Sequence, residues 1–578
     1  MTIDLSTITF TNEDDIVPEP GFEDKIVNTG IANTFAGNDT IIGRGPYDEN
    51  GNLTNYGIIN IGTLNMGEGK DIITGYGFDN PGIVNSGTLN TAEDDDIITG
   101  ESYDNSGIIN SGTLNTGEGN DIITAKTYEG DYGIVNSSTL NTGEGNDTIT
   151  ASGGDDGIHN TDTFNTGDGD DIITAWGGLN TYNGWGGTGI YNTGTFSTGE
   201  GNDRISGDGG SGIFNSGTLD TGEGNDTIGG GGAKGSGISN IGTLNTGDGD
   251  DVIGGGGIGI AKGSILDTGN GNDRISGGGG LYNESITFNT GDGNDTLEGS
   301  GDYSGIENTG LINTGNGKDT IIGIADGSAY NSNPNSTSAG LSNLSTIDTG
   351  DGEDMITGRG GILNNGTIDT GNGDDIITGI SEIFYNYNDI GTATGGIHNK
   401  GTIDTGDGDD IITGMGGFSN NGDYINGIDN KGTIDTGNGN DSIIAEGLFM
   451  GTDGTINTGD GKDIITSIND IENHGTINTG NGADSIIANG GFKGMGSVFL
   501  GNGKDYLKGF GSGNFHGGKN QDTLELTSGS YTIAISGTTV SFTYSGVTMI
   551  TFEFEKLKAG NTTHDFSSLS HGQTMVVP

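Results

Sequence analysis

Apolar residues recur along this chain as isolated positions set among glycine, asparagine and threonine. In the copy that spans residues 107–124 these positions are Ile108, Leu114 and Ile123. The residue that follows Asp121 varies from copy to copy, whereas the second residue after it is always Ile or Leu, as expected where alternate residues of a short strand face in and out. Three inward columns per copy therefore predict three short parallel strands in each coil of a parallel β-helix.

The aspartate of this pattern returns twenty times between Asp39 and Asp522. Fourteen of the nineteen intervals are 17 to 26 residues long, and the other five are 31 to 35 residues long. A repeat of this length is typical of a solenoid in which every coil is one copy of the same unit. We therefore predict an all-β chain that forms an elongated parallel β-helix or β-roll solenoid of about 20 coils. With ~4.8 Å between stacked strands, the solenoid would be a rod on the order of 100 Å long.

The longer intervals contain insertions that we expect to project as loops from one corner without breaking the stack. They include residues 176–188, 324–339, 381–394 and 415–424. Loops carry function more often than the scaffold beneath them, so we expect partner contacts in these insertions. The aromatic residues found there include Trp176, Tyr182, Trp185, Tyr330 and Tyr385.

Composition along the chain divides it into four segments. Residues 1–35 precede the regular repeat and form an N-terminal cap, and residues 36–525 form the solenoid. Residues 526–560 alternate apolar and polar positions between glycines, which predicts an antiparallel meander that caps the open end of the solenoid. Residues 561–578 form a polar tail.

The overall composition limits both the core and the partners. Glycine accounts for 123 of 578 residues and hydrophobic residues for 29%, so a large globular core is not available. The net charge of −61 argues against nucleic acid or an anionic membrane as a partner, because both would be repelled, and it favours cations. The absence of cysteine removes disulfides, thiol catalysis and cysteine metal sites, and no apolar run approaches the length of a membrane span.

Seventeen copies keep the pattern Gly-x-Gly-x-Asp, which has the chemistry of a hard-cation site. The two glycines let the backbone turn sharply and aim carbonyl oxygens inward, and the aspartate adds a carboxylate at the end of the turn. An all-oxygen set without His or Cys favours Ca²⁺ over Zn²⁺ or copper, and an irregular carbonyl-rich cage favours it over Mg²⁺. Stacked carboxylates about 5 Å apart would repel by roughly 1 kcal/mol per pair in water unless a cation lies between them.

Turn propensity alone would explain any one copy of this pattern. It does not explain an aspartate that never becomes Asn or Ser in twenty copies. We therefore predict that the chain binds multiple Ca²⁺ ions. The predicted ligands are Asp71, Asp121, Asp147, Asp171, Asp203, Asp226, Asp251, Asp273, Asp295, Asp319, Asp354, Asp375, Asp410, Asp441, Asp463, Asp484 and Asp505, with Gly117, Gly119, Gly143 and Gly145.

The segment Gly117-Glu-Gly-Asn-Asp121-Ile-Ile123 resembles the RTX, or haemolysin-type, calcium-binding repeat, a glycine-rich nonapeptide. The resemblance covers roughly residues 36–525. It implies that loop carbonyls and aspartates of successive turns chelate Ca²⁺ between them. The first two ligand sets that it implies are Gly117, Gly119 and Asp121, then Gly143, Gly145 and Asp147.

Two features depart from the family pattern. The first glycine of the family motif is usually threonine here, as at Thr116, and the motif occurs once per coil instead of on both sides. This arrangement implies a single calcium ladder along one edge of the solenoid. Three copies also lack the full glycine pair, namely those that end at Asp39, Asp96 and Asp522.

The ends of the chain bear on its location. The N-terminus lacks the basic and apolar stretches of a cleaved secretion signal. The tail at residues 561–578 looks like the uncleaved C-terminal region of RTX proteins exported by a type I system, although a cap with a frayed end is the alternative. The resemblance therefore implies an extracellular or cell-surface protein that crosses the exporter unfolded and folds on Ca²⁺ outside the cell.

Three functions remain open at this point. The first is a calcium-binding structural or adhesive protein whose partner is a cell-surface or matrix polysaccharide, or a second copy of itself. The second is ice or crystal-surface binding, because Thr113, Asn115 and their equivalents would form two flat outward rows; between residues 348 and 435 the Asn becomes Asp, which would spoil such a face. The third is a β-helix carbohydrate-active enzyme, but the six histidines are dispersed and mark no site, so we expect no enzymatic activity.

Overall fold

Each coil contains three short strands because apolar and polar side chains alternate in three places per repeat. In one coil of the computed structural model these strands are β12 (Ile108–Asn110), β13 (Thr113–Glu118) and β14 (Ile122–Thr127). The structure describes residues 2–18, 24–45, 56–178, 186–232, 237–325, 339–381, 395–418 and 424–578. The predicted loop positions Tyr182, Trp185, Tyr330 and Tyr385 lie outside the described residues.

The three apolar columns predicted from the sequence form the core. Ile108, Leu114 and Ile123 are fully buried, whereas Ile122, next to the last of them, is 40% exposed. Removing each such buried side chain from water contributes about 1.5–3 kcal/mol, which drives the coil to close around these columns. Strands of successive coils pair in parallel and in register, so that each apolar side chain stacks on the same position of the next coil.

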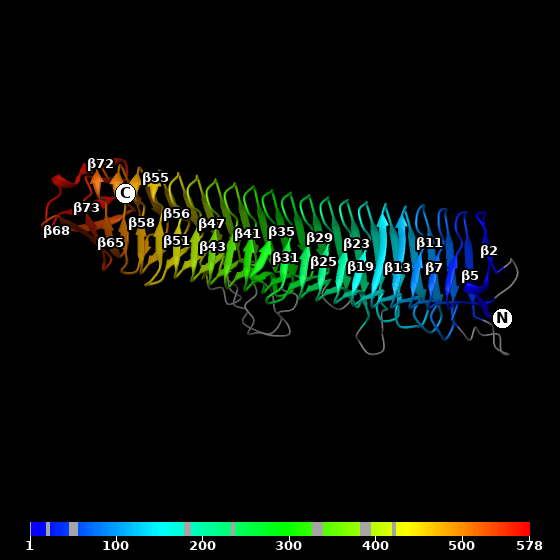
Figure 1. Cartoon of the computed structure of the whole chain (residues 1–578). Coiled ribbons are helices and arrows are strands. Elements are labelled where there is room, and N and C mark those ends of the chain that lie inside the picture. The colour runs from blue at the N-terminus through cyan, green and yellow to red at the C-terminus, as the bar shows by residue number, and fades with distance from the viewer. Residues whose placement is uncertain are drawn as a thin grey trace. The chain divides into compact units, whose positions relative to one another are not determined.

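The chain forms two compact units, Met1–Gly291 and Asp292–Pro578, and each builds its own stack of coils (Figure 1). Among the described residues of unit 1, three parallel sheets form. The first contains β1 (Thr2–Asp4), β3 (Lys25–Asn28), β6 (Ile58–Asn60), β9 (Ile83–Asn85), β12, β15 (Ile134–Asn136), β18 (Ile158–Asn160), β21 (Thr188–Asn192), β24 (Ser211–Asn215), β27 (Ile238–Asn240), β30 (Ile258–Ile260) and β33 (Leu281–Asn283). The second contains β4 (Ile31–Asn33), β7 (Thr63–Asn65), β10 (Thr88–Asn90), β13, β16 (Thr139–Glu144), β19 (Thr163–Asn165), β22 (Thr195–Ser197), β25 (Thr218–Asp220), β28 (Thr243–Asn245), β31 (Ile265–Asp267) and β34 (Thr287–Asn289). The third contains β2 (Ile16–Val17), β5 (Thr40–Arg44), β8 (Ile72–Tyr76), β11 (Ile97–Ser102), β14, β17 (Thr148–Ser152), β20 (Ile172–Trp176), β23 (Arg204–Gly209), β26 (Thr227–Gly232), β29 (Val252–Gly255) and β32 (Arg274–Gly277).

The described part of unit 2 repeats the same three sheets. The first contains β36 (Ser304–Asn308), β39 (Ala339–Asn343), β42 (Ile362–Asn364), β45 (Ile397–Asn399), β50 (Ile428–Asn430), β53 (Leu448–Met450), β57 (Ile471–Asn473) and β61 (Phe492–Lys493). The second contains β37 (Leu311–Asn313), β40 (Thr346–Asp348), β43 (Thr367–Asp369), β46 (Thr402–Asp404), β51 (Thr433–Asp435), β54 (Thr455–Asn457), β58 (Thr476–Asn478), β62 (Ser497–Phe499) and β65 (Gly513–His516). The third contains β35 (Thr296–Gly301), β38 (Thr320–Ala325), β41 (Met355–Arg359), β44 (Ile376–Ile380), β47 (Ile411–Met415), β52 (Ser442–Ala445), β56 (Ile464–Ser467), β60 (Ser485–Ala488), β64 (Tyr506–Lys508), β67 (Thr523–Leu526) and β71 (Lys556–Ala559).

Smaller pieces complete unit 2. A four-stranded parallel ladder lies at the glycine turns, and a two-stranded antiparallel pair lies in one insertion. The ladder consists of β55 (Asp460–Gly461), β59 (Asn481–Gly482), β63 (Asn502–Gly503) and β66 (Lys519–Asn520), and the pair consists of β48 (Gly417–Phe418) and β49 (Tyr424–Ile425).

The C-terminal end changes from parallel to antiparallel pairing, as its alternating sequence predicts. β68 (Gly529–Ser536) pairs antiparallel with β69 (Thr539–Tyr544), which pairs antiparallel with β70 (Val547–Phe552). β73 (Thr574–Val577) pairs antiparallel with β68, and β72 (Thr562–Asp565) with β71. The fold class, an all-β parallel solenoid with an antiparallel C-terminal cap, is therefore confirmed.

Strand pairing extends beyond the predicted solenoid limits at residues 36 and 525. β1 already pairs in parallel with β3, next to the short 3-10 helix η1 (Leu5–Thr7), and β67 pairs in parallel with β71. The tail contains the 3-10 helix η3 (Phe566–Ser568) as well as β73. The division into four separate domains stays a prediction. Within the described residues, no helix is long and apolar enough to cross a membrane.

A column of buried asparagines links successive strands of the first sheet. Asn110 is fully buried, and its side-chain amide donates to Oδ1 of Asn136 in the next coil (2.9 Å) and to the carbonyl of Thr139 (2.7 Å). Asn136 repeats both bonds with Asn160 and Thr163. Because these amides satisfy carbonyls at the corner between two strands, the corner can be buried without an unpaired polar group.

Candidate functional site

The Gly-x-Gly turns form one edge of each coil and leave no room for side chains at the glycines. Gly117 and Gly119 have φ values of +108° and +152°, which L-residues rarely adopt. A Cβ atom at Gly143 would lie 1.7 Å from the carbonyl oxygen of Gly117, and one at Gly145 would lie 1.8 Å from that of Gly119. The carbonyl oxygens of successive turns therefore form two columns that point from one coil to the next.

The recurring aspartates form a third column directly inside these turns. Asp121 is 1% exposed, and all seventeen predicted aspartate ligands are 0–2% exposed. The amide N–H of Asp121 donates to Oδ1 of Asp147 in the next coil (2.7 Å). The same bond, at 2.7–3.0 Å, joins aspartates of neighbouring coils throughout the described ladder of each unit.

The second carboxylate oxygen is the unusual feature of this column. Oδ2 of Asp121 is buried and has no hydrogen-bond partner among the described residues. The same holds for Oδ2 of Asp39, Asp71, Asp96, Asp147, Asp171, Asp203, Asp226, Asp251, Asp319, Asp375, Asp484, Asp505 and Asp522. Buried polar atoms nearly always have a partner, so each of these oxygens calls for a cation or a proton.

In other coils a threonine hydroxyl reaches this oxygen. Thr349 donates to Oδ2 of Asp354 (2.6 Å), and the equivalent bond joins Thr405 to Asp410 (2.7 Å). Thr268 with Asp273, Thr436 with Asp441 and Thr458 with Asp463 form the same pair. In several other coils the hydroxyl donates to a carbonyl instead, as Thr116 does to Thr142 (3.1 Å), and the Oγ1 atoms of Thr166, Thr246 and Thr370 have no partner among the described residues. The threonine that replaces the first glycine of the family motif therefore faces the carboxylate column.

Burial shifts the protonation equilibrium of these carboxyls. It raises the pKa of Asp71 to about 8. The hydrogen bond from the Asp39 amide lowers this pKa, and the neighbouring charges of Asp96 and Asp39 raise it further. Burial likewise raises the pKa of Asp147 to about 7 and that of Asp226 to about 6. A divalent cation beside Oδ2 would supply the positive charge that the column lacks and hold these groups ionised.

The residues present fit a hard oxygen-preferring cation. Each turn supplies one carboxylate oxygen and backbone carbonyls, and it supplies no nitrogen or sulfur ligand. In the described part of the chain, no group of three or more His, Cys, Asp or Glu side chains could hold a metal together. An ion in this ladder would therefore depend on backbone carbonyls for most of its ligands. The individual ligands remain predictions.

The three copies without the full glycine pair keep the turn geometry. Phe35, Ala92 and Asp94 have φ values of +78°, +82° and +78°, and Asn520 has +89°, where other coils have glycine. Each such residue costs on the order of 1 kcal/mol, so the stack imposes this conformation on them. Asp96 and Asp522 also remain in the hydrogen-bonded column.

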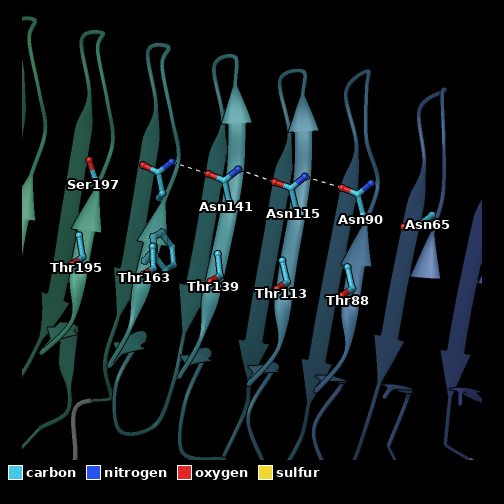
Figure 2. Close-up of a pocket in the computed structure, with 12 residues that line it drawn as sticks. Asn65, Thr88, Asn90, Thr113, Asn115, Thr139, Asn141, Thr163, Thr195 and Ser197 are labelled. Atoms are coloured by element: carbon cyan, nitrogen blue, oxygen red, sulfur yellow. Dashed lines mark hydrogen bonds between the residues drawn. The ribbon is translucent and has the colours of Figure 1, made fainter. Parts of the chain in front are cut away.

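A second candidate site lies on the outward side of the second sheet of unit 1 (Figure 2). Thr88, Thr113 and Thr139 stack in one row, and two residues further along each strand the asparagines stack in another. The rows line a shallow trough of about 560 Å³. Its lining residues are Asn65, Thr88, Asn90, Thr113, Asn115, Thr139, Asn141, Thr163, Phe164, Asn165, Thr195 and Ser197.

Hydrogen bonds order the asparagine row. The side-chain amide of Asn115 donates to Oδ1 of Asn90, Asn141 donates to Asn115 and Asn165 to Asn141, each at 2.7 Å (Figure 2). In unit 2 four successive coils have aspartate at this position, namely Asp348, Asp369, Asp404 and Asp435. The ordered amide row is therefore best developed in unit 1.

Sequence reasoning missed two sets of residues. The first is the buried asparagine column, which includes Asn110 and whose side chains lie inside the coil. The regular Gly-Ile-x-Asn spacing marks that position as clearly as the aspartate spacing marks the turn. The Thr116 column was also missed as a potential donor to the aspartates.

Comparisons with known proteins found similarity only among solved structures. No family model matches the sequence, and no curated protein matches it. Among solved structures, the chain is similar to the crystal structure of a hyperactive, Ca²⁺-dependent, β-helical antifreeze protein from an Antarctic bacterium. The identity is 18% and the TM-score 0.24, over 71% of this chain and 82% of that chain. At these values the function of the present chain has to be argued from its own geometry.

Proposed function

We propose that the chain is a calcium-binding solenoid of the RTX kind that serves as a structural or adhesive protein outside the cell or at its surface. The observation that supports this proposal is the column of buried aspartates, most of which have an Oδ2 atom without a hydrogen-bond partner among the described residues. In a metal-free chain every ionised oxygen in this column would raise the free energy of the folded state, whereas bound cations would offset this cost. Calcium binding and folding would then be one coupled process.

The residues that would hold each ion belong to successive turns. For one site these are the carboxylates of Asp121 and Asp147 and the carbonyl groups of Gly117 and Gly119, which the turn directs toward the next coil. Bound Ca²⁺ would supply charge compensation and link adjacent coils. Each filled site would also order its neighbour, so that the folding transition becomes cooperative.

A double substitution, Asp121→Asn with Asp147→Asn, tests the calcium role. Asparagine keeps the Oδ1 acceptor but removes the charge, so in chelator at pH 8 the variant should be at least as stable as the parent chain. In millimolar Ca²⁺ the order should reverse, with a lower urea midpoint and fewer bound ions, measured by circular dichroism and calorimetric titration.

The matched control for this test is Asp170→Asn with Asp250→Asn. Both aspartates are exposed in the outer part of the turn, where the neighbouring coils carry asparagine: Asn146 and Asn202 beside Asp170, and Asn225 and Asn272 beside Asp250. The control should leave both the calcium stoichiometry and the urea midpoint unchanged. Equal spectra of the parent chain in chelator and in Ca²⁺ would contradict the calcium proposal itself.

Location and partners complete the proposal. The acidic charge and the repeat favour an extracellular or cell-surface protein exported by a type I system, with residues 561–578 as its signal. A cell-surface or matrix polysaccharide, or a second copy of the chain, is the proposed partner, and no catalytic role is proposed.

Ice or crystal-surface binding is the second candidate function. The ordered asparagine row and the adjoining threonine row favour it, because in-register stacking repeats the same donor and acceptor at each coil. A repeating rigid array of this kind suits a repeating surface.

Thermal hysteresis tests this second function. Thr113→Tyr with Thr139→Tyr would disrupt the threonine row and should abolish any thermal hysteresis. The matched variant Thr367→Tyr with Thr402→Tyr changes the aspartate-bearing face of unit 2 and should leave it intact. No thermal hysteresis in the parent chain at millimolar Ca²⁺ would exclude ice as the target.

A further inference from the structure

The residue between the two glycines of each turn points outward and forms an exposed row. In unit 1 this row is acidic in eight successive coils, at Glu68, Glu93, Glu118, Glu144, Asp168, Glu200, Glu223 and Asp248. Glu68 lies directly beside Glu93, Glu93 beside Glu118, and Glu118 beside Glu144. Among the described residues, the six glutamates of this row receive no side-chain hydrogen bond or ion pair that would offset their mutual repulsion.

Unit 2 uses the same row differently. From Asp292 to Asn481 an aspartate alternates with an asparagine in successive coils, and the asparagine donates to the aspartate before it; Asn502 and Lys519 follow in the last two coils. Asn316 donates its side-chain amide to Asp292 (2.8 Å) and its backbone amide to the same oxygen (3.1 Å). The pairs Asn372 with Asp351, Asn438 with Asp407 and Asn481 with Asp460 repeat this bond. The fold therefore does not require an uninterrupted row of carboxylates.

The hydrogen-bond partners of the buried Oδ2 atoms, on the inner side of the turn, also differ between the units. In unit 1 the buried Oδ2 atoms of nine successive coils, from Asp39 to Asp251, have no partner among the described residues, and Asp273 is the exception. In unit 2 threonine hydroxyls reach four of these oxygens, at Asp354, Asp410, Asp441 and Asp463. In unit 2 the Oδ2 atoms of Asp319, Asp375, Asp484, Asp505 and Asp522 also have no partner among the described residues, so unpartnered oxygens form a longer unbroken run in unit 1 but are not unique to it. The larger difference between the units is the exposed row, where unit 1 has successive carboxylates and unit 2 has asparagine donors.

We infer that calcium dependence is concentrated in unit 1, so that unit 2 folds at lower Ca²⁺ and unit 1 is the calcium-gated part of the chain. The inference rests on the proposed calcium function and specifies which part of the chain depends most on the ion for folding. Uncompensated carboxylates raise the free energy of the metal-free fold, and a cation relieves more repulsion where no amide or hydroxyl already does so. At intermediate Ca²⁺ the chain would hold an ordered unit 2 and an open unit 1.

Hydrogen–deuterium exchange of the full chain at stepped Ca²⁺ concentrations, read by mass spectrometry, tests this order. Peptides from residues 56–178 should reach half protection at a Ca²⁺ concentration about tenfold higher than peptides from residues 424–505, which corresponds to a difference of roughly 1.4 kcal/mol. Equal midpoints, or a lower midpoint in unit 1, would overturn the inference while leaving calcium-dependent folding intact. Full protection of both units in chelator would instead refute the calcium function.

Two triple variants test whether the acidic row sets the Ca²⁺ midpoint of unit 1. Glu93→Gln, Glu144→Gln and Glu200→Gln together neutralise every second residue of the acidic row, as the asparagines do in unit 2. This triple variant should lower the Ca²⁺ midpoint of unit 1 severalfold and leave that of unit 2 unchanged. The charge-matched control Asp104→Asn, Glu129→Gln and Glu284→Gln changes exposed carboxylates of unit 1 outside the row and should shift the midpoint of unit 1 much less. Equal shifts in both triple variants would show that net charge, and not the row, sets the midpoint.

Discussion

The two carboxylate oxygens of Asp121 have different surroundings. The Oδ1 atom of each such aspartate accepts the amide of the preceding coil, as Oδ1 of Asp147 does from Asp121, which any Asx side chain could do. Oδ2 lies buried without a partner among the described residues, and an asparagine would place an NH₂ group there. Turn propensity alone would also allow asparagine at this position. The different surroundings of the two oxygens give a reason why all twenty copies have aspartate.

Gly145→Ala tests how strictly the turn excludes a side chain. The new Cβ would lie 1.8 Å from the Gly119 carbonyl oxygen at a φ of +138°, so we expect a loss of about 3 kcal/mol or more in the free energy of unfolding. Gly259→Ala is the matched control, because nothing lies within 4 Å of a Cβ there. Urea denaturation in saturating Ca²⁺ measures both, and a loss below about 1 kcal/mol for Gly145→Ala would contradict the packed carbonyl columns.

At the level of single residues, the position of each aspartate could be predicted but its hydrogen bonds could not. The spacing shows that a carboxylate returns once per coil, whereas the partner of each oxygen depends on the offset between adjacent coils. The same limit applies to Asn316, whose bond to Asp292 pairs residues 24 positions apart in the sequence.

At the level of elements, most strands could be predicted from the periodicity of apolar positions. Alternating apolar positions located β12, β13 and β14, and the longer alternating runs located β68 and β69, because strand faces are set by neighbours in sequence. The first coil was harder to recognise. β2 is only two residues long, and the 3-10 helix η1 lies between β1 and β2, so the three-strand repeat is irregular there.

The asparagine column shows an element-level property that no single strand reveals. Ile260 and Met450 occupy its position in β30 and β53, so an apolar side chain can interrupt the column. The amide chain is therefore a series of separate hydrogen-bonded runs within each unit. Such runs make local opening between them easier than within them.

For the whole molecule, the buried carboxyls are the groups through which stability depends on pH. The ordinary pKa of these groups is 3.8, and burial raises that of Asp71 to about 8 and those of Asp203 and Asp441 to about 7 and 6. Between these limits the folded chain holds more protons than the unfolded chain. Raising the pH through this window therefore favours unfolding.

In chelator, the free energy of unfolding should fall as the pH rises from about 4 to about 8, by up to about 1.4 kcal/mol per pH unit for each such carboxyl. Urea midpoints at pH 5 and pH 8 measure the effect. Saturating Ca²⁺ should remove most of the fall, because the ion replaces the proton. A higher midpoint at pH 8 than at pH 5 in chelator would show that the buried carboxyls are already compensated in the metal-free chain.

The amide-to-carboxylate bond between successive aspartates has a consequence for how such a chain changes over generations. Each coil offers the same donor to one neighbour and the same acceptor to the other, so removing one whole coil joins two surfaces that already match. Unequal crossing-over between repeats would therefore change the gene in whole-coil steps without creating a mismatched junction. Copy number is then a trait that selection can adjust independently of the chemistry of any one turn.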